Sequence, residues 1–430
     1  MAHSIKCQPR ASCPRCHTMD KKILAVVAVV IIVVAAVGVY FAVSDREAED
    51  KEINIIGRVN TDGSAIVAKP SVDVNALMEI QTGTYDGDEP SVYDEANNQT
   101  YIFHVEAWGG MIVGTPGVNA IQQIQMQDFV TNTLGLQYLP YSVGTSINES
   151  TVYYNYSINS YDKMANTEEV QIAIMWEPQC ALANIEGGYT IMITTNVLFP
   201  GHTCCVLAGS HSWMSSHENE TVRFLAAYNT AVEQMNKVIA EKDTNPEAYN
   251  ELMTIAVNNI SFPAGTSPEE KEQIIEKAWE IVVYKSCDDI SAADPLSQLK
   301  TDIADLVDDL YANGNISKNA TDLGFESSQA FAEKYVDSSY IQQAADYQLT
   351  GDESTVNITV AVISGDIHQL AIHYAMAMNI FEEYGINITL SQQPNGDGVA
   401  VALENGSAQI GFIGAPPMTI KVINSEYVTA

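Results

Sequence analysis

The chain has 430 residues, of which 54 are acidic and 20 are Lys or Arg, and 46% of its residues are hydrophobic. This length is sufficient for one large two-lobed domain or two domains of average size, with a sizeable core. The net charge of −34 makes the surface strongly anionic, which excludes nucleic acid and acidic membrane surfaces as partners.

An apolar segment lies close to the N-terminus. Residues 23–43 contain no charged side chain, and a helix of this length, at about 1.5 Å per residue, crosses a bilayer core of roughly 30 Å. Lys21 and Lys22 precede the segment and acidic residues follow it, so the N-terminus is expected on the cytoplasmic side. A cleaved secretory signal is the alternative, but the run is long and no clear cleavage site follows. We expect a single-pass cell-membrane protein with a large extracellular or periplasmic domain.

Cysteines fall into two groups. Cys13, Cys16 and His17 have the spacing of a c-type haem attachment, and with Cys7 they form half of a possible zinc site. Neither is favoured, because the run is predicted to be cytoplasmic and lacks a second ligand pair. The cysteines after the apolar segment are too few for a disulfide scaffold but allow one bridge; they are Cys180, Cys204, Cys205 and Cys287. We expect neither a metal nor a cofactor.

The part of the chain after residue 22 carries 15 basic and 53 acidic residues, a balance that suits an exported domain on a salty or wall-rich surface. It also contains ten Asn-x-Ser/Thr sequences, which agree with an exported surface if the organism glycosylates proteins. They begin at Asn98, Asn148, Asn155, Asn219, Asn259, Asn315, Asn319, Asn357, Asn387 and Asn405.

The exported part alternates strands and helices, which predicts mostly parallel α/β sheets. Residues 53–59 are predicted as a strand that ends in the polar turn 60–64. The acidic run 302–309 is interpreted as a solvated helix face without chemistry.

The last 75 residues repeat the same alternation. Strands are predicted over 357–363, 386–390 and 409–413, with helices over 367–384 and 398–404 between them. Pro416 and Pro417 suit the first turn of a further helix, since that turn needs no N–H donor from them.

After that helix a doubly wound lobe needs another strand, and the chain supplies one only at its other end. Residues 53–59 provide this strand, so the two ends are interpreted as two halves of one domain in reversed order. Residues 345–354, which include Gly351 and polar neighbours, form a plausible join. The sequence therefore predicts a circularly permuted domain.

The motifs of these segments resemble a known family. Residues 365–369, 381–386 and 403–417 resemble the first lobe of ABC-transporter solute-binding proteins of the nitrate/sulfonate/thiamine-pyrimidine class. The segments 114–117, 175–178 and 199–208 resemble its second lobe and the return to the first. The resemblance implies an α/β, two-lobed type II periplasmic binding protein fold, with two doubly wound mixed sheets, circularly permuted and preceded by one N-terminal transmembrane helix.

This resemblance also implies a domain organisation and a set of partners. The expected segments are a cytoplasmic tail (1–22), a membrane anchor or uncleaved signal (23–43), the end of lobe 1 with the first crossover (53–104), lobe 2 (105–198), the return crossover with C-terminal helices on lobe 1 (199–350), and the beginning of lobe 1 (355–430). The implied partners are a small-molecule ligand and an ABC permease. Crossover segments were expected at 64–69 and 204–208. A helix over 218–240 and further helices to about residue 345 are implied by the same family resemblance.

The ligand is expected at the carboxyl ends of the strands, where open α/β sheets bind their ligands. Hinge closure of the two lobes would enclose it. The residues predicted to contact it are Asn60, Asp62, Ser64, Thr115, Trp176, Glu177, His202, Asp366, His368, Gln369, Ala415 and Pro416.

Several of these residues also have structural interpretations. His368 is also consistent with a residue at a helix start that forms local hydrogen bonds, and His202 with a loop residue that has no role in binding. Trp176 is also consistent with packing in the core. Glu177 suits the charge preference of a helix N-terminus, and the Cys204–Cys205 pair suits a buried strand.

The chemical nature of the ligand stays open at this point. No Lys or Arg lies in the predicted cleft loops, so a sulfonate, nitrate-like anion or carboxylate would depend on backbone N–H groups at helix N-termini. A neutral pyrimidine-like heterocycle would instead stack on Trp176.

Two other functions are compatible with the same sequence features. The same fold includes a fungal thiamine-pyrimidine synthase, which uses pyridoxal phosphate on a lysine and a cysteine-rich run. This chain has only Cys204–Cys205 and almost no lysine near the predicted cleft. We therefore expect that the chain is not an enzyme. Alternatively, residues 355–430 could complete the lobe of a neighbouring copy and produce a surface polymer by domain swapping.

Overall fold

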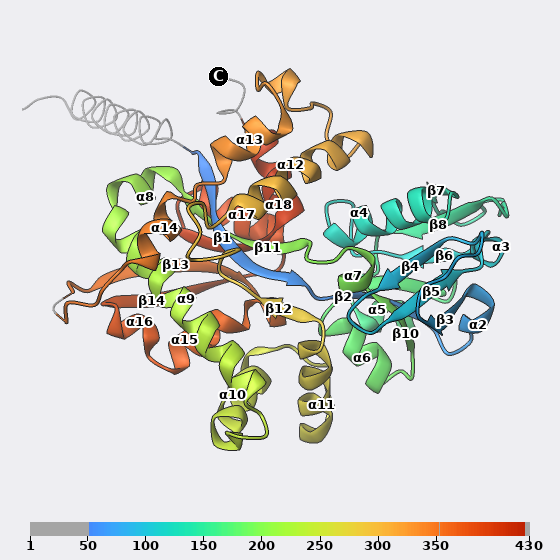
Figure 1. Cartoon of the computed structure of the whole chain (residues 1–430), viewed down its shortest axis with the longest axis horizontal. Helices are drawn as coiled ribbons and strands as arrows, with labels where there is room; N and C mark the ends of the chain where they lie inside the picture. The colour runs from blue at the N-terminus through green and yellow to red at the C-terminus, as the bar shows by residue number, and fades with distance from the viewer. Residues whose placement is uncertain (1–50, 352, 426–430) are drawn as a thin grey trace, which may run out of the picture. The chain divides into compact units, whose positions relative to one another are not determined.

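The computed structural model describes residues 51–351 and 353–425 (Figure 1). The predicted span 23–43 and the run from Cys13 to His17 lie outside the described residues. Within the described ranges, no helix is long and apolar enough to span a bilayer. The described residues form one compact unit. Two six-stranded sheets organise this unit, and each is the centre of one lobe.

Strands from both ends of the chain build the sheet of lobe 1. Its spatial order is β12-β1-β11-β15-β13-β14. β13 pairs in parallel with β14 and β15, whereas β11 is antiparallel to both β15 and β1. The strands are β1 (Ile53–Asp62), β11 (Thr203–Ser210), β12 (Val282–Tyr284), β13 (Val356–Ile363), β14 (Ile386–Gln393) and β15 (Ile410–Gly414).

Lobe 2 has a sheet of order β10-β2-β9-β6-β8-β7. β7, β8, β6 and β9 are parallel neighbours, and β2 is antiparallel to both β9 and β10. The strands are β2 (Ser64–Ala68), β6 (Ile112–Gly114), β7 (Gln137–Pro140), β8 (Thr151–Asn155), β9 (Ile172–Trp176) and β10 (Thr190–Thr194).

The β2 strand shows how the sequence produces this arrangement. Ile66 and Ala68 belong to the core on one face of the sheet, and Ala65 and Val67 to the core on the other face. Successive side chains of a strand point to opposite faces, so a short run that is apolar at every position suits a strand buried on both sides. The same alternation divides the side chains of β9.

A three-stranded antiparallel sheet extends lobe 2. It consists of β3 (Met78–Thr82), β4 (Ser91–Asp94) and β5 (Gln99–Phe103), in the order β3-β5-β4. Phe103 and Trp108 each pack edge-on against Phe129, with ring centroids 4.9 and 5.3 Å apart. These aromatic contacts join the small sheet to the core of lobe 2.

Helices cover both sheets. The lobe 2 segment contains α2 (Val74–Leu77), α3 (Val105–Trp108), α4 (Ile121–Asp128), the π-helix η1 (Phe129–Thr133), α5 (Tyr161–Ala165), α6 (Gln179–Ile185) and α7 (Thr195–Leu198). The following segment contains α8 (His211–Ser216), α9 (Glu218–Ala240), α10 (Pro246–Asn259), α11 (Pro268–Trp279), α12 (Ser297–Ala312), the 3-10 helix η2 (Thr321–Leu323), α13 (Ser328–Tyr335) and α14 (Ser339–Ala345). Residues 356–425 contain the 3-10 helix η3 (Ile367–Gln369), α15 (Leu370–Ala377), α16 (Ile380–Glu383), α17 (Gly396–Glu404) and α18 (Ala415–Ile423).

The long helix α9 joins separate parts of lobe 1. It packs against α14, α15 and α16, as its course beside α15 in Figure 1 shows. Phe224 on α9 stacks on Phe381 of α16, with ring centroids 5.2 Å apart. The buried guanidinium of Arg223 donates through Nη1 to the backbone oxygens of Ser354 (3.0 Å) and Tyr384 (3.1 Å). α9 therefore attaches the C-terminal segment to the sheet of its own chain.

The chain crosses between the lobes at two adjacent places. The first crossing is Asp62–Ser64, where Asp62 and Gly63 both have positive φ angles, of 59° and 95°. The second lies between α7 and β11. Asp62 Oδ1 accepts from the backbone N–H of Gly201 (3.2 Å), and the Asp62 N–H donates to the His202 carbonyl (3.1 Å). These bonds hold the two crossings together.

Several expected boundaries differ from the structure. The crossovers expected at 64–69 and 204–208 are strands inside the sheets, because both segments are apolar and pair on two sides. The helix expected over 367–384 is divided into η3, α15 and α16, since Asn379 adopts a left-handed φ of 57°. β1 continues to Asp62, beyond the expected end at residue 59, because its last residues pair with β12. The helix over 218–240 has the predicted bounds.

Candidate functional site

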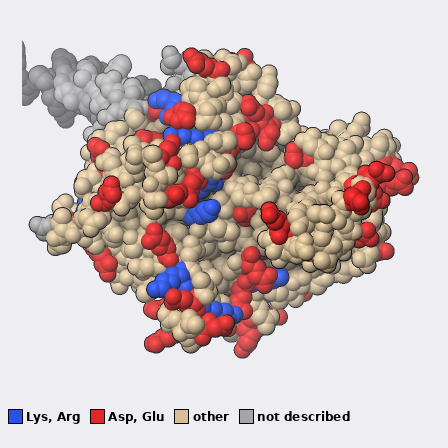
Figure 2. Space-filling model, in the orientation of Figure 1, with Lys and Arg blue, Asp and Glu red and all other residues tan. Residues whose placement is uncertain are grey.

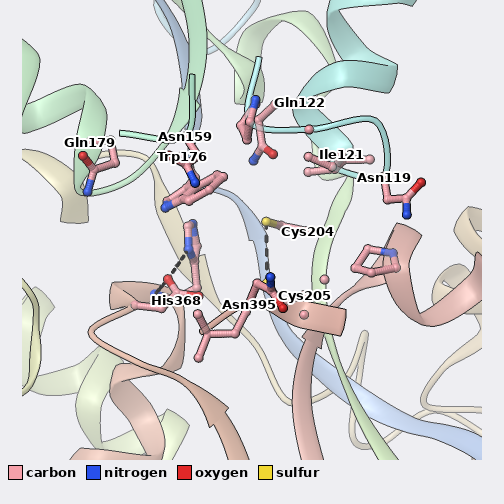
Figure 3. Close-up of a pocket in the computed structure, with 18 of the residues that line it drawn as sticks. Asn119, Ile121, Gln122, Asn159, Trp176, Gln179, Cys204, Cys205, His368 and Asn395 are labelled. Carbon is pink, nitrogen blue, oxygen red and sulfur yellow. Dashed lines mark hydrogen bonds and ion pairs between the residues drawn. The ribbon is translucent and has the colours of Figure 1, made fainter. Parts of the chain in front are cut away.

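A cavity of about 580 Å³ lies between the two lobes (Figure 3). Its walls come from segments that follow the strand ends of both sheets, as well as from the start of β11. The lining segments are 116–122, 159–160, 176, 178–179, 204–205, 261, 363–366, 368, 394–397, 414 and 416–417. The parallel strands β6, β9, β13, β14 and β15 all direct their carboxyl ends to this cavity, which is the usual position of a ligand in an open α/β sheet.

The predicted ligand residues fall into three groups. Trp176, Asp366, His368 and Pro416 line the interlobe cavity. Ala415 and His202 line a second cavity. The others line neither cavity and are buried behind the walls: Asn60, Asp62, Ser64, Thr115, Glu177 and Gln369.

His368 is the centre of a buried polar cluster. Its Nδ1 lies 2.8 Å from Asp366 Oδ1, and its Nε2 lies 3.2 Å from the carbonyl oxygen of Gly63 in the first crossing. Burial alone lowers the pKa of His368, but the charges of Asp366 and Cys204 outweigh burial and raise this pKa to about 9. The imidazole is therefore protonated at neutral pH and donates to both oxygens.

Gln369, which does not line the cavity, orients the Asp366 carboxylate that binds His368. Its Oε1 accepts from the N–H of Ile363 (2.9 Å), and its Nε2 donates to Asp366 Oδ2 (3.3 Å). Gly63 leaves room for the histidine, because a Cβ atom there would lie 2.5 Å from His368 Nε2. The sequence predicted Gln369 as a ligand contact, and in the structure Gln369 holds Asp366 while the Gly63 carbonyl holds His368.

Asn60 and Ser64 also have partners inside the protein. Asn60 Nδ2 donates to the carbonyl oxygens of Thr61 (3.3 Å) and Asp62 (3.1 Å). Ser64 Oγ accepts from Gln122 Nε2 (2.9 Å), and this bond connects the first crossing to the start of α4. Thr115 is completely buried, and its hydroxyl has no hydrogen-bond partner.

His202 and Asp62 form the brace between the two crossings. His202 Nδ1 lies 3.3 Å from Asp62 Oδ1. Burial lowers the pKa of His202, but the hydrogen bond with Asp62, together with the charges of Cys204 and Asp62 and the hydrogen bond with the Phe199 carbonyl, raises it overall. Both residues lie at the crossings and outside the lining of the interlobe cavity, and their direct contact with a ligand stays a prediction.

The two neighbouring residues Trp176 and Glu177 have different surroundings. Trp176 ends β9 and presents its ring to the interlobe cavity (Figure 3). Glu177 is fully buried, and its Oε2 accepts from the Ala181 N–H (3.0 Å) in the first turn of α6. Burial raises the pKa of Glu177 to about 7, against the opposing effects of that hydrogen bond and of His368. Glu177 therefore accepts a hydrogen bond from the first turn of α6, as its structural interpretation indicated.

The helix N-termini at the cavity offer fewer free N–H groups than the sequence suggested. Pro416 and Pro417 open α18 and have no N–H to donate. In α17, Asn395 Oδ1 accepts from the Gly398 N–H (3.0 Å), and Asp397 adds a negative charge. The helices α4 and α6 both begin at the cavity without a side-chain cap or an acidic first turn. At α6 the Glu177 carboxylate already accepts from the Ala181 N–H, so α4 offers the more favourable start for an anion.

Sequence reasoning missed several side chains that line the cavity. Five carry amide groups: Asn119, Gln122, Asn159, Gln179 and Asn395. Each lies just before or within the first turn of a helix, or in a loop after a strand, so the polar residues at these positions were the available signal. Cys204 and Cys205 also line the cavity, although the sequence favoured buried strand positions without contact.

The second cavity, of about 700 Å³, lies between α4 and α12. Arg58 projects from β1 and is fully buried there. Its Nε is 2.6 Å from Asp288 Oδ1, and its Nη2 is 2.9 Å from Asp302 Oδ2. These ion pairs connect β1 to the helices that follow β12.

All four cysteines of the described part are free, so the disulfide that the sequence allowed is not formed there. Among residues 51–351 and 353–425, no group of three or more His, Cys, Asp or Glu side chains is arranged to hold a metal ion. None of the described residues that line the interlobe cavity is Lys or Arg.

Comparison with known proteins does not assign the chain to a family. No family model and no curated protein matches the chain. One solved structure shares 11% identity and a TM-score of 0.43 over 71% of this chain and 78% of its own: the ligand-binding component of an ABC-type import system from Staphylococcus aureus, with zinc bound. A likeness this weak carries no argument about the ligand or mechanism of this chain. The class that the fold and cavity define is therefore a two-lobed α/β protein with a cavity between its lobes.

Proposed function

We propose that the chain is an extracytoplasmic solute-binding protein of an ABC importer. The observation that carries this proposal is the cavity between two similar lobes, at the carboxyl ends of both sets of parallel strands. Two adjacent crossings join the lobes, and rotation about them would close the cavity on a small molecule. Hydrogen bonds from Gln127 Nε2 to Asn313 Oδ1 (2.9 Å) and from Asn315 Nδ2 to the Val118 carbonyl (3.0 Å) already join the lobes at one edge.

The internal similarity of the two sheets supports a circular permutation. In lobe 2, β6, β8, β9 and β10 come in this order along the chain, with the edge strand β7 between β6 and β8, and β2 lies between β9 and β10 in the sheet. In lobe 1, β13, β14 and β15 occupy the equivalent places, β11 enters beside β15, and β1 takes the place of β10. The place of the strand expected after β15 is taken by β1, the first strand of the described residues, which supports the proposed permutation. Membership of the nitrate/sulfonate/thiamine-pyrimidine class is part of the same proposal.

The cavity suits a neutral, polar ring better than a strong anion. Asp366 already neutralises His368, and Asp397 opposes an anion at α17. The amides of Asn119, Gln122 and Asn159 supply both donors and acceptors, and Trp176 supplies a flat apolar surface. We therefore propose a pyrimidine-like heterocycle in preference to a sulfonate or nitrate-like anion.

A membrane-anchored, outward-facing position is also proposed. The uncharged run 23–43 and the charge asymmetry around it support an anchor. All ten Asn-x-Ser/Thr asparagines are at least partly exposed, so each is open to glycosylation where the organism has that machinery. Figure 2 shows acidic side chains spread over one face of both lobes, with few basic ones.

A thermal-shift screen of the full chain in detergent tests the function. Pyrimidines, sulfonates, nitrate and other small metabolites are compared, because a ligand that binds only the native state adds about 2.7 kcal/mol at a hundredfold excess over Kd. We expect a pyrimidine-like compound to raise the melting temperature of the wild type but not of Trp176→Ala. Trp213→Ala, on α8 outside the cavity lining, is the matched control. If no compound in the panel raised the melting temperature, the result would contradict capture of these compounds by the protein.

The alternative of a domain-swapped surface polymer makes a different prediction. In the structure, β15 pairs with β11 of the same chain, β13 and β14 extend the sheet from β15, and Arg223 donates to the Ser354 carbonyl just before β13. We expect the mass measured by size-exclusion chromatography with light scattering to be independent of concentration. Growth of the species with concentration would favour the polymer.

A further inference from the structure

A β-bulge places two adjacent cysteines on the same side of β11. Asn60 of β1 lies opposite Cys205, and Thr61 lies opposite Thr203, so Cys204 has no opposing residue. In a regular strand adjacent side chains point to opposite faces, and a bulge changes the direction of one of them. As a result both cysteines line the interlobe cavity, with their Sγ atoms 3.8 Å apart (Figure 3).

The surroundings of the pair favour a reactive thiolate. The hydrogen bond with Cys205 lowers the pKa of the Cys204 thiol, and the charges of His368 and His202 lower it further against the effect of burial. The same hydrogen bond, together with burial, raises the pKa of Cys205. One sulfur is therefore an anion that accepts the S–H of the other.

The other two cysteines of the described part differ from this pair both in position and in the direction of the pKa shift. Cys180 lies inside the core of lobe 2, where its thiol is 2.9 Å from the Met175 carbonyl oxygen. Burial raises the pKa of Cys180 and of Cys287. Neither of them lines the interlobe cavity, so they provide internal controls for the pair.

We propose that Cys204 and Cys205 form a dithiol site for a soft electrophile that makes two bonds to sulfur, of which a trivalent arsenical is the simplest. When an arsenical of the form R–As=O reacts, two As–S bonds form and both As–O bonds break. The oxygen leaves as water, with one proton from the remaining S–H and one from the solvent, and neither arsenic nor sulfur changes oxidation state. The site depends on the two thiols and their cavity, and not on transport of a solute.

The probe is phenylarsine oxide, added to the full chain in which Cys7, Cys13 and Cys16 are changed to Ser. We expect intact-mass analysis to show one added phenylarsenic group per chain, removable by a dithiol but not by a monothiol. Cys204→Ser and Cys205→Ser should each abolish this stable adduct, whereas Cys180→Ala and Cys287→Ala should retain it. Retention of the adduct in both serine variants, or no adduct in the background protein, would overturn the proposal.

A second measurement does not depend on the folding of the variants. Under native conditions the arsenical should protect Cys204 and Cys205 from alkylation by iodoacetamide, as read by peptide mapping. Equal alkylation of both cysteines with and without the arsenical would contradict the site.

Discussion

Lobe 2 takes all six strands of its main sheet from one continuous stretch, 64–194, whereas lobe 1 takes its six from three separate stretches, 53–62, 203–284 and 356–414. Both sheets nevertheless have parallel strands on one side of an antiparallel strand that enters from the other lobe. Strand pairing and burial therefore decide the arrangement, and the order of the strands along the chain does not. The difference implies that lobe 1 needs specific contacts to hold its separate parts together.

The largest predicted effect concerns Arg58, the buried cation that connects β1 to the region after β12. Arg58→Ala leaves Asp288 and Asp302 without their partner in a partly buried site, and the free energy of unfolding should fall by about 3–5 kcal/mol. Urea denaturation measures this change. The exposed ion pair of Lys242 with Glu276 is the matched control, and Lys242→Ala should cost about 1 kcal/mol or less. Equal effects of the two changes would contradict the role of Arg58.

The second prediction concerns Arg223, which holds the beginning of the C-terminal segment. Arg223→Ala leaves the carbonyl oxygens of Ser354 and Tyr384 without a donor and should cost about 2–3 kcal/mol. Hydrogen exchange should accelerate first in β13 and β14 and leave β6 and β9 of lobe 2 unchanged. Uniform acceleration in both lobes would show that the C-terminal segment is not a separately attached part.

A pH dependence tests the charges beside the cavity. The pKa of His368 is raised from 6.5 to about 9, so its contribution to stability is complete below pH 6.5 and lost as pH rises through 9. The pKa of Cys204 is lowered from 9.0 to about 6, so its contribution is complete above pH 9 and lost as pH falls through 6. Because the two slopes are opposite, they nearly cancel in the wild type between pH 6.5 and 9.

Two variants separate these contributions. Relative to the wild type, Cys204→Ala should lose stability as pH rises over this range, and His368→Gln should gain it, each by up to about 1.4 kcal/mol per pH unit. Chemical denaturation at several pH values measures both differences. If the plots of unfolding free energy against pH were parallel for the three proteins, the result would contradict a charged His368 beside a charged Cys204.

The smallest predicted effect concerns Thr115, whose buried hydroxyl has no partner. Thr115→Val keeps the shape and removes the unpaired group, so stability should stay constant or rise by about 1 kcal/mol. The melting temperature measures this change. A large loss of stability would reveal a partner of the hydroxyl, and a loss of ligand affinity would restore Thr115 as a contact.

Much of the fold could be predicted from the sequence, because strands such as 356–363 are short, apolar and bounded by turn residues. The helix of residues 218–240 was predicted from the family resemblance, in which it follows the segment 199–208. The break at Asn379 could not be predicted, because a left-handed residue leaves no clear signal unless it is glycine. Likewise, the small sheet of β3–β5 carries no motif.

The site was predicted less well than the fold. His368 and Trp176 were found because they follow strand ends, and such positions can be read from the sequence. The exposure of Cys204 to the cavity could not be found, because it depends on a bulge in the pairing with β1. Asp62 and His202 come from segments far apart in the sequence, so their mutual contact at the crossings depends on the tertiary fold.

Small-angle X-ray scattering, with and without the compound that raises the melting temperature most, tests solute capture between the lobes most directly. We expect the radius of gyration of the wild type to fall when that compound is added, because the lobes close on it, and to stay constant for Trp176→Ala. An unchanged radius in a wild-type protein shown to be saturated with the compound would contradict capture by closure of the two lobes.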